Sequence, residues 1–523
     1  MSLENSNCRE ISITPRLRSV FILVSLLASA GLLIVTAPHG IGVSSDSVGY
    51  ISTARNIAIG NGVTWFHGGP LLVWPPLYPA VLAVPGFLLG VDAVVVARFT
   101  NAILFACLVY LSGLAGLYSL PAPYQTIGAL FCITSTALST CIVQVCLSAW
   151  SEALFIFLVL LCLLNLRRYI MDGARNAFLV MSLAASLAAL TRYIGVVLVP
   201  TVAICLWFQR RDSARIKVGQ LLQFTLISLV PLAGWLLRNY AVSGTLMGPR
   251  GASIYTLRET LGRAYRVVSF WYLPDRPETV YIAVLAGVTL VAYCLYVFLR
   301  RHHSPISAEM GLLLPWAVFL LLYVLVLCTS SARVAYGLIN SRLMSPAFVP
   351  LTVIGSAVIS EFSVSVIKLL RVRWAGILAA AAIIAAGSAG PARFTLPTVR
   401  AAMTQGIGYS SVRWGQSETV QYIRHWVTPG PESTVYSNAP DVAYLLADLE
   451  AVEVPARTLY NSSHVVGDLD ALRGSWPSTT AYIVWFDGVL REYQYTIDQL
   501  SNISNVHLLI RLSDGAVYSV SPQ

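Results

Sequence analysis

Eleven long runs of apolar residues recur along this chain, and they constrain its fold more than any other feature. A helix needs about 20 apolar residues to cross roughly 30 Å of hydrocarbon. The chain is 56% hydrophobic and only 11% charged, which is far more apolar than an ordinary soluble domain. The sequence therefore predicts an α-helical polytopic membrane protein with about eleven transmembrane helices. The candidate spans lie near 19–37, 93–119, 123–146, 149–166, 177–190, 194–208, 219–237, 279–299, 311–329, 345–361 and 374–390.

Two neighbouring candidates leave this count open. The run at 177–190 is short, and the run at 194–208 begins directly after Thr191-Arg192-Tyr193. The two runs could instead form one long broken helix. In that case every later loop would move to the opposite side of the membrane.

Basic residues near the helix ends favour eleven spans. With a cytoplasmic N-terminus, fifteen of them fall in inner loops, as the positive-inside rule expects. Arginines that face anionic lipid account for much of the net charge of +10, so no nucleic-acid partner is needed. The first run lacks a cleavage pattern and is predicted to remain as an anchor in the plasma (inner) membrane. The fifteen are Arg9, Arg16, Arg18, Arg167, Arg168, Arg175, Arg210, Arg211, Arg215, Lys217, Arg300, Arg301, Lys368, Arg371 and Arg373.

An odd number of spans places the C-terminal part of the chain outside the cytoplasm. From about residue 391 the composition becomes that of a globular protein, so we divide the chain into a transmembrane domain, 1–390, and an extracytoplasmic α/β domain, 391–523. None of the nine cysteines lies in the second domain, which is expected to fold without disulfides. The elements predicted there are helices near 417–427, 440–448 and 491–501, strands near 433–437 and 481–486, and a hairpin that pairs 506–512 with 515–520.

The outer loop 38–92 is too apolar to be a simple connector. Helical spacing over 47–60 predicts an amphipathic helix on the membrane surface, and the proline-broken segment 74–85 predicts a second interfacial helix. Aromatic residues of this loop are expected to act as anchors at headgroup depth. They are Trp65, Phe66, Trp74 and Tyr78.

A second outer loop, from about 240 to 278, carries more basic than acidic residues. This excess opposes the usual charge bias, so an anionic group at the outer membrane surface is one explanation and solvated loop charge is the other. The basic residues are Arg250, Arg258, Arg263, Arg266 and Arg276.

Five ionisable residues fall where helices meet the outer surface in this topology. Ionisable groups placed at such positions are candidates for function. Each has an ordinary explanation when taken alone: an aspartate caps a helix, a glutamate favours a helix N-terminus, and an arginine extends its head to the interface. The five are Asp46, Glu152, Arg192, Arg238 and Arg342.

The stretches around these residues resemble the GT-C superfamily of polytopic glycosyltransferases, in the branch of protein O-mannosyltransferases and the bacterial aminoarabinose transferase. The resemblance implies a hexosyl- or pentosyltransferase that moves a sugar from a polyprenyl-phosphate carrier to a lipid, glycan or protein acceptor at the extracytoplasmic face. The matching stretches are the loop from Asp46 to Gly62, Pro75-Pro76-Leu77-Tyr78-Pro79, Ser151-Glu152, Thr191-Arg192, Arg238-Asn239-Tyr240 and Arg342 with Pro346.

The resemblance also suggests roles for individual residues. Asp46 is expected to be the general base, because an acceptor hydroxyl needs a carboxylate to take its proton. Glu152 is expected to be a second carboxylate of the active site. Arginines suit the leaving phosphate because their charge is permanent and their donors are planar. The expected donor phosphate-binding residues are Arg238, Arg342, Arg192 and Arg55, and the expected substrate-pocket residues are Tyr50 and Tyr240.

The chain departs from the family pattern at two positions. Many relatives have a second acidic residue directly after the loop aspartate, whereas Ser47 stands here, so we expect no divalent metal and no other cofactor. A basic residue often precedes the proline segment, whereas Trp74 stands here. The main alternative function is a transporter or flippase for a lipid-linked sugar or an anion, although carriers tend to place ionisable groups near the bilayer midplane. A non-enzymatic scaffold for the C-terminal domain is a third possibility.

Overall fold

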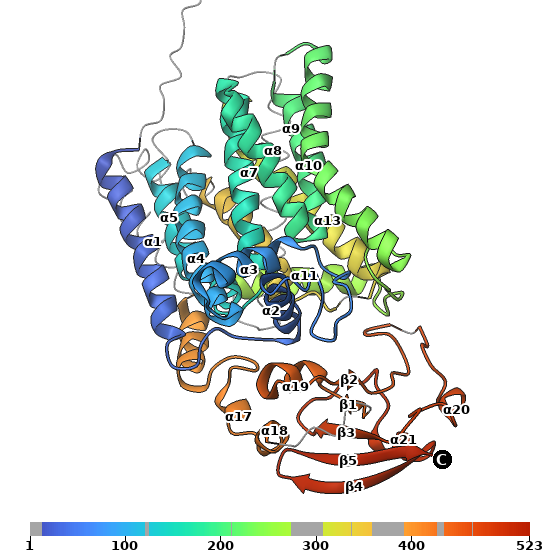
Figure 1. The fold of residues 1–523 in the computed structure, drawn as a ribbon. Coiled ribbons are helices and arrows are strands. Elements are labelled where there is room, and N and C mark those ends of the chain that lie inside the picture. Colours follow the sequence, from blue (N-terminus) through green and yellow to red (C-terminus); the bar gives the residue numbers. More distant parts are fainter. Residues whose placement is uncertain are drawn as a thin grey trace, which may run out of the picture.

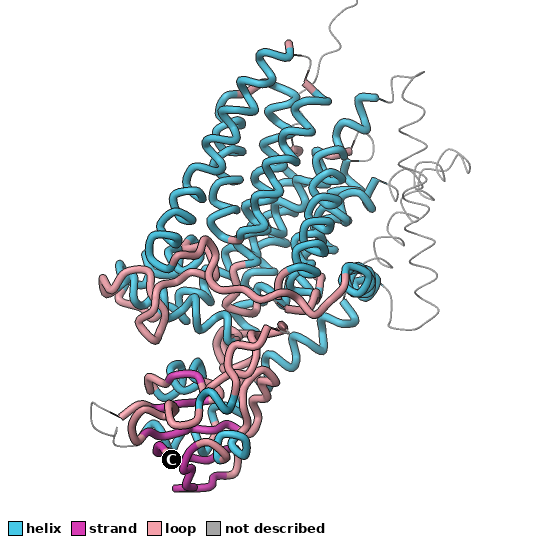
Figure 2. Tube along the Cα trace, turned by 90° about the vertical axis from the view of Figure 1, so that its right-hand side faces the viewer, coloured by secondary structure: helices cyan, strands magenta, loops and turns pink. Residues whose placement is uncertain are grey.

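A bundle of apolar helices forms the upper part of the molecule, and a small domain with a β-sheet lies below it (Figure 1). This computed structural model describes residues 13–120, 125–210, 212–272, 307–335, 337–357, 392–425, 433–462 and 464–523. The helices of the bundle run side by side, and all strands of the sheet gather at the opposite end of the molecule (Figure 2).

Five helices of the described chain are long and apolar enough to cross a membrane. They are α1 (Pro15–Val35), α4 (Ala93–Tyr118), α7 (Glu152–Asp172), α10 (Ala214–Ser243) and, from Leu312 onward, α13 (Ser307–Arg333). A pair bent by 52°, α5 (Gln125–Ala137) and α6 (Thr140–Cys146), would make a sixth span. The chain is a multi-pass membrane protein, but the count of eleven is not confirmed. The runs predicted at 279–299 and 374–390 lie outside the described residues, as does the end of the run at 345–361.

The two short runs are separate segments. Helix α8 (Arg175–Thr191) ends at Arg192, which lies beside Glu152 at the start of α7. The 3-10 turn η1 (Tyr193–Val197) and α9 (Leu198–Gln209) then return, because Arg210 donates a hydrogen bond to the carbonyl of Tyr169 near the other end of α7 (2.9 Å). One long broken helix could not have both ends at these places. That alternative is therefore wrong.

The first outer loop forms the two predicted helices, α2 (Ser45–Ala58) and α3 (Leu77–Leu89), which pack against each other. The N-cap of α2 is Ser44, which makes a capping box with Ser47, so the chain does not use Asp46 as the cap. Residues 47–54 are all buried, so α2 does not lie open on a surface as the amphipathic spacing predicted. The burial follows from close packing by α3 and by the loop between the two helices.

The aromatic residues of this loop contact one another and α2, and their expected role as anchors at headgroup depth stays a prediction. The rings of Trp65 and Trp74 are nearly parallel, with centroids 5.2 Å apart, and Tyr50 contacts both Trp74 (5.0 Å) and Tyr78 (5.2 Å). A Cβ at Gly49 would lie only 2.6 Å from the Trp74 ring, so only glycine permits this approach. The stack fixes the loop against α2.

The C-terminal domain is a five-stranded sheet in the order β2-β1-β3-β5-β4, with β1 parallel to β2 and β3, and β5 antiparallel to β3 and β4. The predicted α/β arrangement and hairpin are confirmed. The helix expected over 491–501 is wrong at its start, because a capping box at Thr496 begins it at Ile497. Helix α19 lies between the sheet and the bundle (Figure 1). The elements are α17 (Val412–Gly415), α18 (Glu418–Arg424), β1 (Val435–Ser437), α19 (Pro440–Ala447), β2 (Val452–Glu453), α20 (Leu469–Leu472), β3 (Ala481–Phe486), α21 (Ile497–Ser501), β4 (Ser504–Leu512) and β5 (Gly515–Pro522).

Gly49→Ala is expected to lower the thermal midpoint of the detergent-solubilised protein, because the new methyl group would collide with Trp74. Overpacking of this kind costs about 1–3 kcal/mol. The control is Gly31→Ala in α1, where no heavy atom lies within 4 Å of the added Cβ. Equal midpoints for the two variants would contradict the tight packing of Trp74 on α2.

Candidate active site

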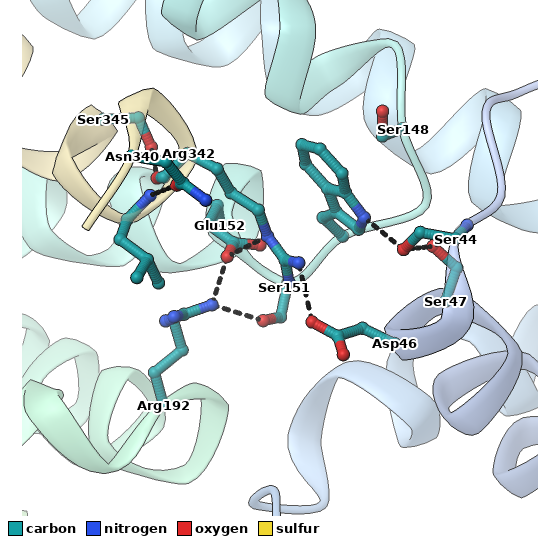
Figure 3. Close-up of polar contacts among 12 residues, drawn as sticks. Ser44, Asp46, Ser47, Ser148, Ser151, Glu152, Arg192, Asn340, Arg342 and Ser345 are labelled. Atoms are coloured by element: carbon teal, nitrogen blue, oxygen red, sulfur yellow. Dashed lines mark hydrogen bonds and ion pairs between the residues drawn. The ribbon is translucent and has the colours of Figure 1, made fainter. Parts of the chain in front are cut away.

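Four charged side chains from distant parts of the chain meet at one place in the structure (Figure 3). Arg342 donates from one nitrogen to Asp46 (2.6 Å) and from another to Glu152 (2.7 Å). Arg192 donates to the same oxygen of Glu152 and to the hydroxyl of Ser151 (3.3 Å). The structure thus brings together both predicted carboxylates and two of the predicted arginines.

Each of these residues occupies the end of a helix. Asp46 lies in the first turn of α2 and Glu152 in the first turn of α7, where the helix dipole favours negative charge. Arg192 is the C-cap of α8, where positive charge is favoured. Arg342 lies in the short helix α14 (Ser341–Met344), which leads through η3 (Ser345–Ala347) into a helix over 348–357. The residues at which these helices begin and end therefore determine where the charges lie.

Helix α14 is held in place by contacts at both of its ends. Asn340 caps it by accepting from the backbone N–H of Leu343 (3.0 Å). The hydroxyl of Tyr323, on α13, donates to the carbonyl of Leu343 (2.6 Å). Trp271, on α11 (Leu257–Tyr272), donates from its indole to the hydroxyl of Ser341 (3.1 Å). These contacts fix the backbone from which the Arg342 side chain extends.

The two carboxylates differ sharply in their access to solvent. The side chain of Glu152 is 1% exposed, whereas that of Asp46 is 38% exposed. Burial alone would lower the pKa of the Arg342 guanidinium, but the negative charges of Glu152 and Asp46 raise it well above its usual range. Arg342 therefore stays charged, and one oxygen of Asp46 stays bonded to it.

Trp150 belongs to this site although the sequence analysis gave it no role. The guanidinium of Arg342 lies over its ring, 4.3 Å from the centroid. The Trp150 indole donates to the hydroxyl of Ser44, the N-cap of α2 (2.8 Å). The signal in the sequence was its position directly before Ser151-Glu152.

Of the two tyrosines predicted to line a substrate pocket, Tyr50 contacts the site and Tyr240 lies apart from it. Tyr50 is buried, and its hydroxyl lies 3.2 Å from that of Ser151. Tyr240 is 59% exposed on α10. The two tyrosines have different surroundings. Their assignment to the substrate pocket stays a prediction.

Arg238 contacts the outer loop rather than the four-residue cluster. It donates to the carbonyls of Leu71 (2.9 Å) and Val63 (3.4 Å), and its guanidinium lies over the Trp235 ring at 4.8 Å. Its hydrogen-bond partners among the described residues are neutral oxygens, so no carboxylate in that part of the chain is bonded to it. Arg250 donates to the carbonyl of Val73 in the same loop (2.9 Å).

Arg55 is also outside the cluster. It pairs with Asp92, the N-cap of α4, at 2.8 Å. Arg55 lies nine positions after Asp46, and at about 100° per residue it emerges from the opposite side of α2. There it lines an open groove of about 540 Å³ together with Tyr444 of α19.

No group of three or more His, Cys, Asp or Glu side chains that could hold a metal ion occurs among the residues that the structure describes. The only candidate ligands at the cluster in this part of the chain are the two carboxylates, and both are bonded to Arg342.

No protein-family model and no curated protein matches the chain. The fold matches several solved glycosyltransferase structures. ArnT from Cupriavidus metallidurans bound to undecaprenyl phosphate has a TM-score of 0.57 at 12% identity, with 97% of this chain and 98% of that chain covered. The oligosaccharyltransferase of Archaeoglobus fulgidus tethered to an acceptor peptide has a TM-score of 0.58 at 11% identity, covering 97% and 74%.

The arabinofuranosyltransferase AftD from Mycobacteria gives a TM-score of 0.54 at 14% identity, covering 98% of this chain and 40% of that chain. These proteins are GT-C glycosyltransferases, so the resemblance indicated by the sequence motifs is confirmed at the level of the fold.

Glu152→Gln is expected to destabilise the protein by about 3 kcal/mol, because it removes a buried negative charge that is shared by two arginines whose side chains are only 18% and 16% exposed. Thermal unfolding in detergent measures the effect. The control is Asp92→Asn, which weakens an exposed ion pair worth about 0–1 kcal/mol and keeps a side chain able to cap α4. A Glu152→Gln midpoint no lower than that of the control would show that the cluster is not stabilised as described.

Proposed function

We propose that this chain, a membrane protein with the GT-C fold, is a glycosyltransferase that moves a sugar from a polyprenyl-phosphate carrier to an acceptor hydroxyl at the extracytoplasmic face. One observation carries the proposal. A half-exposed carboxylate, Asp46, is held by Arg342, which is itself bonded to the buried Glu152. This arrangement supplies a base with a fixed orientation beside permanent positive charge.

Asp46 is the general base in this proposal. Arg342 holds its Oδ2, while Oδ1 accepts no hydrogen bond from any residue in the described part of the chain. The acceptor hydroxyl bonds to Oδ1 and gives up its proton as its oxygen attacks the anomeric carbon. The new carbon–oxygen bond forms while the bond from that carbon to the carrier phosphate breaks. The electron pair leaves with the phosphate, and the proton ends on Asp46.

Glu152 has a different role because it is closed to substrate. It is buried, and one of its oxygens accepts from both Arg192 and Arg342. A carboxylate in this setting orients the two guanidiniums and does not attack the sugar. Asp46 is the one accessible carboxylate of the cluster among the residues that the structure describes, so the proposed reaction is a single displacement that inverts the configuration at the anomeric carbon.

Arginines bind the leaving phosphate in this proposal. Arg192 and Arg342 each have N–H donors beyond those that bond the carboxylates. Tyr193, the residue after Arg192, donates to the carbonyl of Leu72 (3.0 Å), while Arg238 and Arg250 donate to the neighbouring carbonyls of Leu71 and Val73 (2.9 Å each). In this proposal the phosphate binds among these four guanidiniums, which suits a phosphate without a divalent metal.

We also propose an orientation in the membrane and a class of acceptor. The N-terminus is cytoplasmic, the cluster and residues 391–523 lie on the outer side of the plasma membrane, and the acceptor is a lipid, glycan or protein. ArnT, whose fold matches over nearly the whole of both chains, was solved with undecaprenyl phosphate, which supports a carrier of that class. Whether the sugar is a hexose or a pentose depends on contacts to a bound donor.

Asp46→Asn is expected to lower kcat for sugar transfer by about 10²- to 10⁴-fold, because the amide cannot accept the proton. Purified protein is supplied with a radiolabelled polyprenyl-phosphate sugar and an acceptor extract, and donor binding is measured separately. Binding is expected to persist. Asp92→Asn makes the same chemical change at another outer helix end and is expected to leave kcat unchanged. Full activity of Asp46→Asn would eliminate Asp46 as the base, and donor movement without any transfer would favour a transporter.

Arg238→Gln is expected to weaken the binding of a polyprenyl phosphate in detergent micelles by about tenfold or more, the effect of losing a charge-assisted hydrogen bond. The matched control is Arg424→Gln in the C-terminal domain, where the arginine also donates to a backbone carbonyl. Unchanged affinity in Arg238→Gln would remove this arginine from the donor site.

A further inference from the structure

Residues 41–43, just before α2, are held between two other segments of the chain. On one side, Gly42 donates to the carbonyl of Leu147 (2.8 Å) and accepts from the N–H of Ala149 (2.8 Å). On the other side, the N–H of Tyr409 donates to the carbonyl of Val43 (2.7 Å). The hydroxyl of Ser410 adds a bond to the carbonyl of Ile41 (2.7 Å). These hydrogen bonds form a short ladder that joins residues 41–43 to residues 147–149 and to residues 408–410.

These segments lead directly to the proposed site and to the C-terminal domain. Residue 43 is followed by Ser44 and, three positions on, by Asp46. Residues 147–149 are followed by Trp150 and Glu152. Residues 408–410 join the helix over 392–405 to the remainder of the C-terminal domain. A shift of the third segment therefore acts on the backbone that carries both carboxylates.

The contact between the segments is too close to accommodate extra atoms. A Cβ at Gly408 would lie 2.1 Å from the carbonyl oxygen of Val43, and its φ of +59° also favours glycine. A Cβ at Gly42 would lie 2.8 Å from the side chain of Ile407. The two glycines allow the backbones to touch.

Tyr409 connects this ladder to the interior of the C-terminal domain. Its ring packs against the cores of both domains and meets Trp414 edge-on at 5.6 Å. Its hydroxyl donates to Asp441 at the start of α19 (2.7 Å), and Asp441 is paired with Arg491 (2.6 Å). The carboxylate of Asp441 is buried, so this hydrogen bond is shielded from water.

The C-terminal domain also contacts the far end of α2. Tyr444 of α19 stacks on Phe66 of the outer loop at 5.2 Å and lies beneath the guanidinium of Arg55 at 5.7 Å. Helix α2 is thus contacted by the C-terminal domain at its beginning, through Tyr409, and near its end, through Tyr444.

We propose that Tyr409 is a positioning residue, through which the C-terminal domain sets the location of the Asp46 carboxylate. The inference rests on the proposed function, because it assigns a catalytic consequence to the position of Asp46. Tyr409 acts at a distance: its hydroxyl bonds Asp441 while its own N–H bonds Val43, so the same residue fixes the domain and the start of α2. Misplacement of a catalytic group by about 1 Å costs up to 10²-fold in rate.

Tyr409→Phe is expected to lower kcat about tenfold with the KM for the lipid-linked donor unchanged. In the Asp46→Asn background the same change is expected to have no further effect, since two residues that act as a unit are not additive. The control is Tyr495→Phe, which removes one hydrogen bond (2.8 Å, to the carbonyl of Gly467) from the same domain. A kcat equal to that of the control, or an equal effect in both backgrounds, would overturn the proposal.

A second readout does not depend on catalysis. Amide hydrogen exchange at Gly42, Ala149 and Tyr409 is expected to be faster in Tyr409→Phe than in Tyr495→Phe. Gly408→Ala is expected to act more strongly than Gly474→Ala, a glycine with a similar φ (+75°) and no heavy atom within 4 Å of its added Cβ. Unchanged exchange in both ladder variants would overturn the inference even if Asp46 is the base. Faster exchange together with an active Asp46→Asn would instead reject only the proposed function.

Discussion

The fold is organised around the pairing of two carboxylates with two guanidiniums where four helix ends meet. Arg342 bonds Asp46 across 296 positions of sequence and Glu152 across 190. A buried charge without a partner costs several kcal/mol, so these distant segments are held together once the bundle forms. The helix dipoles support the arrangement, because both carboxylates lie at helix N-termini and Arg192 lies at a C-terminus. The site is a consequence of how the helices begin and end.

The same pairing gives different roles to two carboxylates that are chemically alike. Glu152 is buried among donors and serves to orient them, whereas Asp46 keeps one oxygen available on the accessible side. Trp150 and Tyr50 support this difference: Trp150 donates to Ser44, two residues before Asp46, and Tyr50 bonds Ser151, directly before Glu152. In our proposal the C-terminal domain adds a further restraint on Asp46, because Tyr409 bonds both Val43, before α2, and Asp441 of that domain.

Much of this arrangement could be predicted from the sequence, because a break in an apolar run marks a helix end whichever helices surround it. That is why Asp46, Glu152, Arg192 and Arg342 could all be predicted at one surface. Hydropathy does not show which ends touch, so the pairing of Arg55 with Asp92 could not be foreseen. The stacking of the aromatic residues in the outer loop could not be foreseen for a related reason: the sequence does not show which rings meet, such as those of Trp65 and Trp74, or that Gly49 allows Trp74 to approach α2 closely.

The most direct test of the account is a structure of the protein with a polyprenyl-phosphate sugar bound. The phosphate is expected to contact guanidiniums among Arg192, Arg238 and Arg342, with the anomeric carbon facing Oδ1 of Asp46. A phosphate bound away from all three arginines, or a sugar on the side of α2 that carries Arg55, would contradict it.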